Sequence, residues 1–199
     1  MASVMVDYAV ASFVTPGQRD SGDLEVVREH AGGVVIAVID GIGHGDEAAA
    51  AARIARAVID RDPQASPVAL VMRCHEALRR TRGVVLSIAS IDFARRAIRW
   101  LGVGNVRALV QHAEAGISPA REELLLRAGV VGAADLPTLQ ASVIPFHERD
   151  TLILATDGIR PQFADTLVVA GRPQALADEI LAGNCQGNDD ALVLVARAR

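Results

Sequence analysis

At 199 residues the chain has room for one domain with a sizeable core, expected over residues 1–199, and its 51% hydrophobic content gives no compositional case for disorder. A net charge of -4 gives no general attraction to polyanions, and 3% aromatic residues leave few rings for stacking bases, so neither nucleic acid nor membrane is an expected partner. All of the 20 basic residues are arginine, so the lysine that a P-loop or a Schiff-base enzyme needs is missing.

The first part of the chain predicts three strands. An apolar, partly alternating segment over residues 4–13 ends at a Pro16-Gly17 turn, as an opening strand would. Residues 24–29 and 34–40 are expected to form two further strands, joined as a hairpin through Ala31-Gly32-Gly33.

Two helices are predicted next. Residues 46–60 are alanine-rich, begin with Asp-Glu, and place on the buried face Ile54, Val58 and Ile59. Residues 68–80 have helical apolar spacing, with a predicted buried face of Leu70, Val71, Cys74, Ala77 and Leu78. Arginines, including Arg82, follow at the closing turn, where cations favour the helix dipole.

The pattern changes after Gly83 to short apolar stretches between turn residues. Strands are predicted over residues 84–93, 98–103, 106–112, 124–126, 139–146 and 151–156, as an antiparallel meander. A late helix over residues 173–181 and a final strand over residues 191–196 complete the chain. Because the helices come in separate groups, an α+β sandwich is favoured over a doubly wound parallel sheet.

Two passages share one form, in which an apolar strand delivers an aspartate and then a glycine. They are V-I-D-G-I at residues 38–42 and A-T-D-G-I at residues 155–159. Each glycine would let the backbone turn sharply and approach whatever the carboxylate holds. Further acidic points are Asp23, in a polar loop, and Asp189-Asp190, just before the last strand. The alternative interpretation is that D-G is a common turn dipeptide and that the acidic pair caps a strand.

Carboxylates brought together at strand ends raise each other's pKa unless a divalent cation lies among them. Ligand sets made only of oxygen select hard ions, so Mg²⁺ or Mn²⁺ is expected. Zinc would need His and Cys at short spacing, whereas Cys74 and Cys185 are unclustered and suggest neither a zinc knuckle nor a disulfide framework.

Five motifs in order resemble the type 2C metal-dependent phosphatase family over nearly the whole chain. They are S-G-D (21–23), D-G-I-G-H-G (40–45), V-G-N-V-R (103–107), T-D-G-I (156–159) and N-D-D-A-L-V-L-V (188–195). Within the family, the short length, the Arg-Gly before the antiparallel strands and the G-N-V-R step are similar to the stressosome feedback phosphatases of the RsbX type. The resemblance implies a four-layer α-β-β-α sandwich of two antiparallel sheets flanked by helices, with metals at one end.

The resemblance also implies a site and a reaction. Asp40 would bridge two Mn²⁺ or Mg²⁺ ions, the Gly41 carbonyl would ligate one, and Asp157 and Asp189 would ligate the other. Asp23 would act directly or through water. The ions would activate water against a phosphoserine or phosphothreonine, without a covalent phosphoenzyme.

Some positions depart from the family pattern. Asp190 stands where many relatives have Asn and would replace Asp189 as a ligand if the register differs by one. Asn105 stands where relatives often have Asp, which weakens the case for a third ion. Many eukaryotic members have His directly after D-G, whereas this chain has Ile42 and then His44.

Two side chains near these motifs have open roles. His44 is a candidate catalytic acid, with water on a metal as the rival and a surface histidine as the plain alternative. Arg19, four residues before Asp23, is a candidate phosphate ligand or a solvated loop arginine.

The implied partners are phosphorylated stressosome scaffold and antagonist proteins of the STAS type, acted on by a monomer. With no basic leader in residues 1–14 and no apolar run long enough to cross a bilayer, a cytoplasmic protein is expected.

Two rival functions stand beside the phosphatase. A dinucleotide-binding domain is disfavoured because the glycines run G-x-G-x-G and Asp40 would face the pyrophosphate. The other rival is a catalytically inactive phosphatase-fold module acting in protein-protein regulation, which the fold alone would not exclude.

Overall fold

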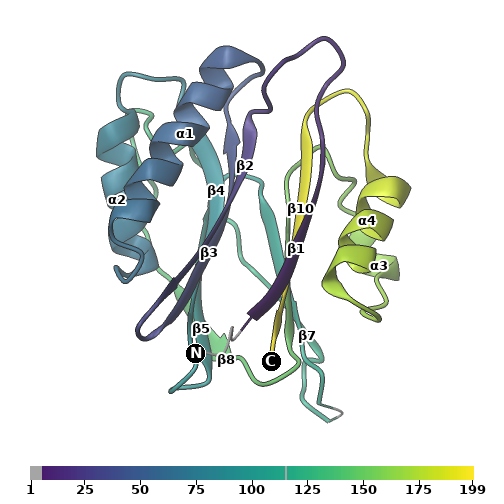
Figure 1. Ribbon diagram of the computed structural model, residues 1–199. Coiled ribbons are helices and arrows are strands. Elements are labelled where there is room, and N and C mark those ends of the chain that lie inside the picture. The colour runs from purple at the N-terminus through teal and green to yellow at the C-terminus, as the bar shows by residue number, and fades with distance from the viewer. Residues whose placement is uncertain (1–5, 115) are drawn as a thin grey trace.

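The computed structural model describes residues 6–114 and 116–199 and consists of two five-stranded antiparallel sheets packed face to face (Figure 1). Sheet A contains, in spatial order, β1 (Val6–Phe13), β10 (Ala191–Ala198), β9 (Thr151–Ala155), β6 (Arg107–Gln111) and β7 (Arg121–Glu123). Sheet B contains β2 (Asp23–His30), β3 (Gly33–Gly41), β4 (Val84–Asp92), β5 (Ala97–Val103) and β8 (Ser142–Pro145).

A helix pair covers the outer face of each sheet (Figure 1). Sheet B is covered by α1 (Asp46–Arg61) and α2 (Pro67–Leu78), and sheet A by α3 (Phe163–Thr166) and α4 (Pro173–Asn184). The expected four-layer α+β sandwich is confirmed. No helix in the described part of the chain is both long and apolar enough to span a bilayer.

The central strands are buried on both faces because each lies between the opposite sheet and a helix pair. In β3, Ile36 and Val38 pack between the sheets with Trp100, while Ala37 and Ile39 pack under the helices. This burial explains why β3 is a continuous apolar run, whereas the edge strand β1 contains both buried and exposed residues.

The buried face of α1 differs from the prediction. Ile59 is fully buried and Val58 packs against the core, but Ile54 is 36% exposed. The helix instead presents its small side chains to the sheet, namely Ala48, Ala49, Ala51, Ala52 and Ala55. Methyl groups allow a close approach, because a Cβ placed on Gly41 would lie only 2.2 Å from the Ala48 carbonyl oxygen.

In α2 the predicted buried face is correct except at Ala77, which is exposed. His75 is buried in addition, because its Nδ1 accepts a hydrogen bond from the Gly132 N–H at 3.1 Å. The apolar spacing could not reveal this polar anchor, since its partner lies far along the chain.

The predicted meander is wrong in its connectivity, although every strand pair is antiparallel. The chain crosses from β5 in sheet B to β6 and β7 in sheet A, returns to β8, and crosses again to β9. The strand predicted over residues 124–126 is also wrong, because β7 ends at Glu123 and Leu124 then turns into the core between the sheets. The short helix α3 was not predicted, and residues 4 and 5 of the first predicted strand lie outside the described residues.

Candidate metal centre

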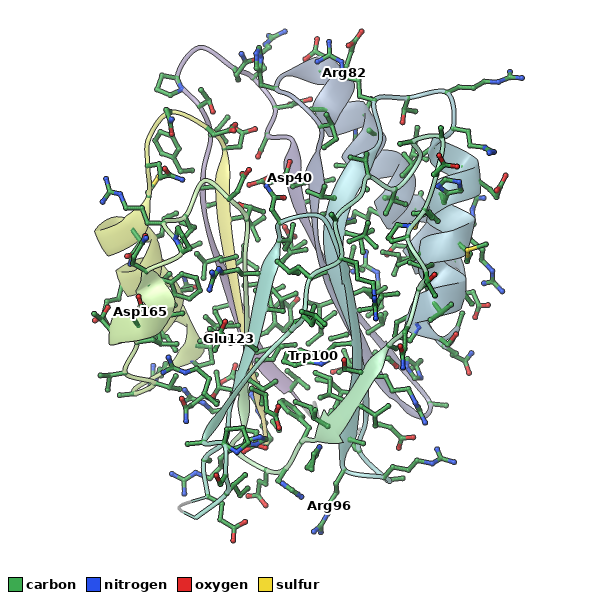
Figure 2. All side chains as sticks on the ribbon, turned by 180° about the vertical axis from the view of Figure 1, so that it is seen from behind. Asp40, Arg82, Arg96, Trp100, Glu123 and Asp165 are labelled. Atoms are coloured by element: carbon green, nitrogen blue, oxygen red, sulfur yellow. The ribbon has the colours of Figure 1, made fainter. Side chains whose placement is uncertain are left out.

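The two D-G motifs end strands that belong to different sheets. Asp40 is the last residue but one of β3 in sheet B, and Asp157 follows β9 in sheet A by two residues. Asp189 precedes β10, the neighbour of β9 in sheet A. The sandwich therefore brings the ends of three strands to one end of the molecule, where Asp40 is labelled in Figure 2.

Asp40, Asp157 and Asp189 line one pocket of about 400 Å³, which is within the usual range for small-ligand sites. The other lining residues are Ile42, Gly43, His44, Val85, Gly104, Asn105 and Ala128. Three carboxylates predicted from separate motifs thus share one space.

The electrostatics of the pocket are those of uncompensated negative charge. Burial, together with the charges of the neighbouring aspartates, raises the pKa of Asp40 to about 8. Burial and then the charge of Asp189 also raise the pKa of Asp157, although Asn105 donates a hydrogen bond to its carboxylate. A divalent cation would relieve both effects, and the oxygen donors suit Mg²⁺ or Mn²⁺. The donor chemistry of the pocket therefore fits the metal that the motifs imply.

The carboxylates do not already form a closed ligand group. Within residues 6–114 and 116–199, no three His, Cys, Asp or Glu side chains are close enough together to hold a metal ion as they stand. Repulsion among neighbouring carboxylates opposes such closure unless a counter-charge is present. The pocket is therefore an open acidic site.

Asp23 lies beside the pocket and not in its lining. It begins β2 directly opposite Asp40 in the strand register and is 5% exposed. Its Oδ2 accepts a 2.7 Å hydrogen bond from the Thr156 hydroxyl, whose oxygen in turn accepts from the Leu192 N–H. Burial raises the pKa of Asp23 to about 7, against the lowering effect of Thr156. Asp23 thus adds negative charge behind Asp40 and joins the two sheets.

The structure separates the two adjacent aspartates before β10. Asp189 lines the pocket, whereas Asp190 is buried and accepts hydrogen bonds from Thr15 N, Thr15 Oγ1 and Gly22 N at 2.7 to 2.9 Å. Burial alone would raise the pKa of Asp190, but these hydrogen bonds outweigh it and hold the pKa below its usual value. Asp190 therefore fixes the loop between β1 and β2, and Asp189 is the one that faces the pocket.

Of the remaining predicted site residues, His44 lines the pocket, whereas Gly41 and Arg19 are not among its lining residues. Gly41 ends β3, and its N–H donates to the Gly22 carbonyl at 3.0 Å. His44 is exposed, lines the pocket, and has its Nδ1 3.4 Å from Gln18 Nε2. Arg19 is exposed and is not among the lining residues.

Other side chains support the site beyond the roles the sequence suggested. Asn105 Nδ2 donates to Asp157 Oδ2 at 2.7 Å, and Gln186 Nε2 donates to the Asp157 carbonyl at 2.6 Å. Arg82 covers Gly43 so closely that a Cβ there would lie 2.6 Å from Nη1, and it pairs with Glu47 at 2.5 Å. Figure 2 places Arg82 and Asp40 at the same end of the molecule. Arg82 was predicted to lie at the closing turn of the helix and formed part of the Arg-Gly step in the family resemblance, but no contact with Gly43 was predicted for it.

A second hollow of about 270 Å³ adjoins the acidic pocket, since Asn105 and Asp157 line both. Its other walls are largely apolar and include Leu126, Ile159 and Phe163, with Arg107 as its cation.

Comparison with known proteins shows the family. Residues 30–199 match the family described as Stage II sporulation protein E (SpoIIE). The chain therefore belongs to the SpoIIE family of type 2C phosphatase domains, which confirms the resemblance seen in the motifs. As a class these domains are metal-dependent.

Similar proteins include the phosphoserine phosphatase RsbX of Bacillus subtilis (strain 168), which is 28% identical over 102 residues, or 51% of this chain and 51% of RsbX. The match thus spans about half the length of that curated relative. A structure described as "The bacterial stressosome: a modular system that has been adapted to control secondary messenger signaling" is 27% identical, with a TM-score of 0.87 over 96% of this chain and 99% of its own. RsbX in complex with magnesium has a TM-score of 0.87 at 19% identity, over 100% of this chain and 98% of its own, which shows the shared fold.

Proposed function

We propose that this chain, as a single domain, is a metal-dependent phosphoserine/phosphothreonine protein phosphatase. The observation that carries the proposal is that Asp40, Asp157 and Asp189, from three separate strand ends, line one acidic pocket. Membership of the SpoIIE family and the similarity to the phosphoserine phosphatase RsbX support it.

In this proposal two Mn²⁺ or Mg²⁺ ions bind in the acidic pocket. Asp40 would bridge them, the Gly41 carbonyl would ligate one, and Asp157 and Asp189 would ligate the other, with Asp23 acting from behind Asp40. When bound, the ions would supply the positive charge that activates water and neutralises the phosphoryl oxygens.

The chain's own residues would orient this centre and the substrate. Asn105 fixes the Asp157 carboxylate through its hydrogen bond, which leaves the other carboxylate oxygen for a ligand. His44 lines the same pocket and carries an imidazole, so it is the candidate to protonate the leaving serine or threonine oxygen. Arg82, beside Gly43, supplies a cation for the phosphate.

The proposed substrates are phosphorylated stressosome scaffold and antagonist proteins of the STAS type, met by a monomer in the cytoplasm. The similarity to RsbX and to the stressosome-related structure supports the substrate class. Both cysteines, Cys74 and Cys185, are free thiols, which suits a reducing compartment.

The test of this function is metal-dependent hydrolysis. Purified protein with Mn²⁺ is expected to release phosphate from p-nitrophenyl phosphate and from a phosphoserine protein, and EDTA is expected to abolish the activity because the carboxylates alone cannot activate water. Phosphate release is measured with and without EDTA, followed by excess Mn²⁺ to restore turnover. Absence of turnover on both substrates, with Mn²⁺ and with Mg²⁺, would favour the inactive regulatory module.

Arg82 and Arg19 give a second prediction about phosphate binding. Arg82→Gln is expected to raise KM for the phosphoprotein roughly tenfold with a smaller change in kcat, because a guanidinium pairs well with phosphate but is half-exposed here. Arg19→Gln is expected to change KM less, because Arg82 lies against the lining residue Gly43, although neither arginine itself lines the pocket.

Arg80→Gln, at an exposed arginine just after α2, is the matched control for the loss of one positive charge. A larger KM effect from Arg19→Gln than from Arg82→Gln would assign the phosphate contact to Arg19.

A further inference from the structure

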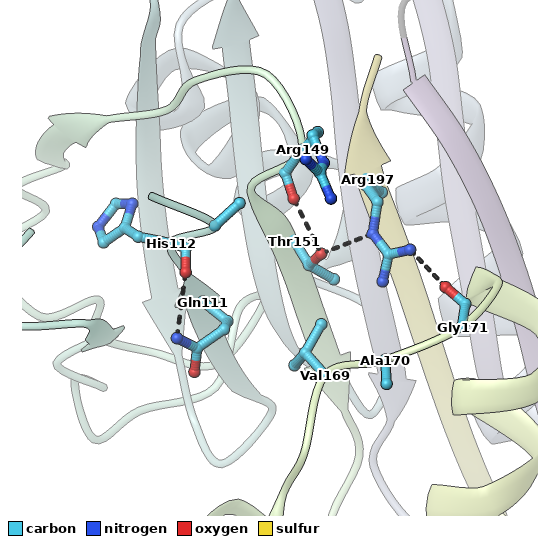
Figure 3. A pocket seen from close by; sticks show the side chains of 9 residues that line it. Gln111, His112, Arg149, Thr151, Val169, Ala170, Gly171 and Arg197 are labelled. Atoms are coloured by element: carbon cyan, nitrogen blue, oxygen red, sulfur yellow. Dashed lines mark hydrogen bonds between the residues drawn. The ribbon is translucent and has the colours of Figure 1, made fainter. Parts of the chain in front are cut away.

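A second polar pocket, of about 470 Å³, lies on the outer face of sheet A (Figure 3). Its floor is one row of cross-strand neighbours, Gln111 on β6, Thr151 on β9 and Arg197 on β10. The segment before α4 forms one wall with Val169, Ala170 and Gly171. The rest of the lining comes from the loop after β6, with His112 and Ala113, and from the loop before β9, with Arg149.

This pocket is separate from the acidic one. Thr151 begins β9 and Asp157 follows its other end, so at about 3.3 Å per residue the two lie roughly 20 Å apart. No residue lines both pockets. A ligand of this pocket would therefore not be the phosphate group under hydrolysis.

Arg197 is held in place inside the pocket. Its Nε donates to Thr151 Oγ1 at 3.0 Å, and its Nη1 donates to the Gly171 carbonyl at 2.5 Å (Figure 3). The guanidinium has further N–H groups beyond these two bonds, and they remain available to a ligand. A cation fixed in this way loses little freedom when it binds an anion.

Arg149 lines the same pocket, and its backbone has an unfavourable conformation. Its φ is 68°, in the left-handed region, where a residue with a Cβ is disfavoured. The loop enforces this conformation, because Arg149 N donates to the Ala198 carbonyl at 2.9 Å and Asp150 N donates to the His147 carbonyl at 3.1 Å.

The buried carboxylate of Asp150 completes the restraint on this loop. It accepts hydrogen bonds from His112 Nδ1, Ala113 N and His147 N at 2.8 to 2.9 Å. Asp150 is therefore held in place. The neighbouring Arg149 side chain is exposed and has no hydrogen bond or ion pair within the described residues.

The two guanidinium groups meet no negative charge in the pocket. None of its lining residues is acidic. Asp150 is engaged by its three donors, and Asp7, opposite Arg197 in the register, has its carboxylate 3.9 Å from Arg199. Two arginines converging on one space without a counter-charge repel each other, and an anion would relieve that repulsion.

We propose that this pocket binds the phosphate group of a small organic phosphate. Arginine matches phosphate geometry with paired N–H groups, so the two guanidinium groups would hold it. Thr151 and Gln111 shape the floor and are already engaged, since Thr151 Oγ1 donates to the Arg149 carbonyl at 3.5 Å and Gln111 Nε2 donates to the Ala120 carbonyl at 2.8 Å. Val169 and Ala170 provide an apolar wall for the organic part, and the pocket volume exceeds what a bare phosphate would fill.

Binding is tested on the full chain in EDTA, so that phosphate bound to metals at the acidic pocket does not contribute. Adenosine monophosphate, inorganic phosphate and adenosine are titrated, and binding is measured by calorimetry and by amide shifts of residues 149–151, 169–171 and 197. Adenosine monophosphate is expected to bind at least about tenfold more tightly than inorganic phosphate, and adenosine is expected not to bind. Equal affinity for the two phosphates would overturn the organic ligand, and no shifts at these residues with either would overturn the site.

Variants separate binding from stability. Arg197→Gln and Arg149→Gln are each expected to weaken binding about tenfold or more, whereas Arg61→Gln, at an exposed arginine on α1, is expected to leave it unchanged. Arg149→Gly is the sharpest variant, because it relieves the left-handed strain and should keep or raise the melting temperature while weakening binding to the same degree. Unchanged affinity in Arg149→Gly would overturn the proposal, and a failure of either kind leaves the metal-dependent phosphatase test unaffected.

Discussion

Replacing Asp40 with Asn is expected to lower turnover with Mn²⁺ by about a thousandfold while the protein stays folded. Asp40 is the proposed bridge between two ions, so its loss removes charge from both at once, and several kcal/mol of transition-state stabilisation correspond to about this factor. Asp157→Asn is expected to show a similar loss, since Asp157 lines the same pocket from the other sheet. Initial rates at saturating Mn²⁺ measure both effects.

The same variant has a second readout in the stability of the metal-free protein. The folded pKa of Asp40 is about 8, well above the value of about 3.9 expected for an unfolded chain. Between these values the native state binds the extra proton, so this group makes the metal-free protein less stable as pH rises from 4 towards 8. Asp40→Asn removes the charge, and in EDTA at pH 8 the variant should melt at a higher temperature than the wild type. Higher stability with lost activity identifies a metal ligand and not a structural residue.

Asp165→Asn is the matched control, because Asp165 is exposed on α3 and lies far from Asp40 in Figure 2. It should change neither turnover nor the pH dependence of melting. Normal turnover in both Asp40→Asn and Asp157→Asn would remove the metal assignment altogether.

Much of this site could be predicted because the D-G motifs carry local information. An apolar strand followed by an acidic residue and glycine specifies both the element and the position of the carboxylate at its end. The two such strand ends meet Asp189, which precedes β10, at one end of the sandwich. The order of strands and helices was likewise visible, since apolar runs bounded by turns survive in any arrangement.

The rest depended on contacts that no local pattern encodes. Sheet membership of β6 to β9 depends on pairings between strands far apart in the chain. A series of short strands has the same local pattern whether it forms one meander or crosses between two sheets. Asp189 and Asp190 are identical in sequence terms, and only the hydrogen bonds from Thr15 and Gly22 distinguish them. A loop places Arg82 against Gly43, a lining residue of the pocket. Helix α1 packs through alanines because small side chains bring it closer than Ile54 would.

For the glycines of the D-G motifs, the structure shows a different reason for glycine than the sequence suggested. The sequence suggested a sharp turn, but neither Gly41 nor Gly158 has a positive φ. Each instead leaves space for a neighbouring backbone. A Cβ on Gly41 would lie 2.2 Å from the Ala48 carbonyl oxygen, and one on Gly158 would lie 2.0 Å from the Asp190 carbonyl oxygen.

Gly41→Ala and Gly158→Ala are therefore each expected to destabilise the fold by about 3 kcal/mol or more. A backbone atom at such a distance cannot rotate aside, so α1 or β10 must shift as a whole, which is the costly form of overpacking. Because the clashes lie directly beside Asp40 in β3 and beside Asp189 before β10, activity should fall together with stability, unlike in Asp40→Asn. Urea unfolding and initial rates on the same samples measure the two losses.

Gly183→Ala provides the control that separates steric clash from glycine content. Gly183 lies inside α4, and a Cβ added there would meet no neighbouring atom within 4 Å, so alanine should stabilise the protein by about 0.5 to 1 kcal/mol. If Gly41→Ala unfolds at the same urea concentration as the wild type, α1 does not press on the end of β3. The position of Asp40 would then be set by β3 alone, and the acidic pocket would not depend on the close packing of α1 against β3.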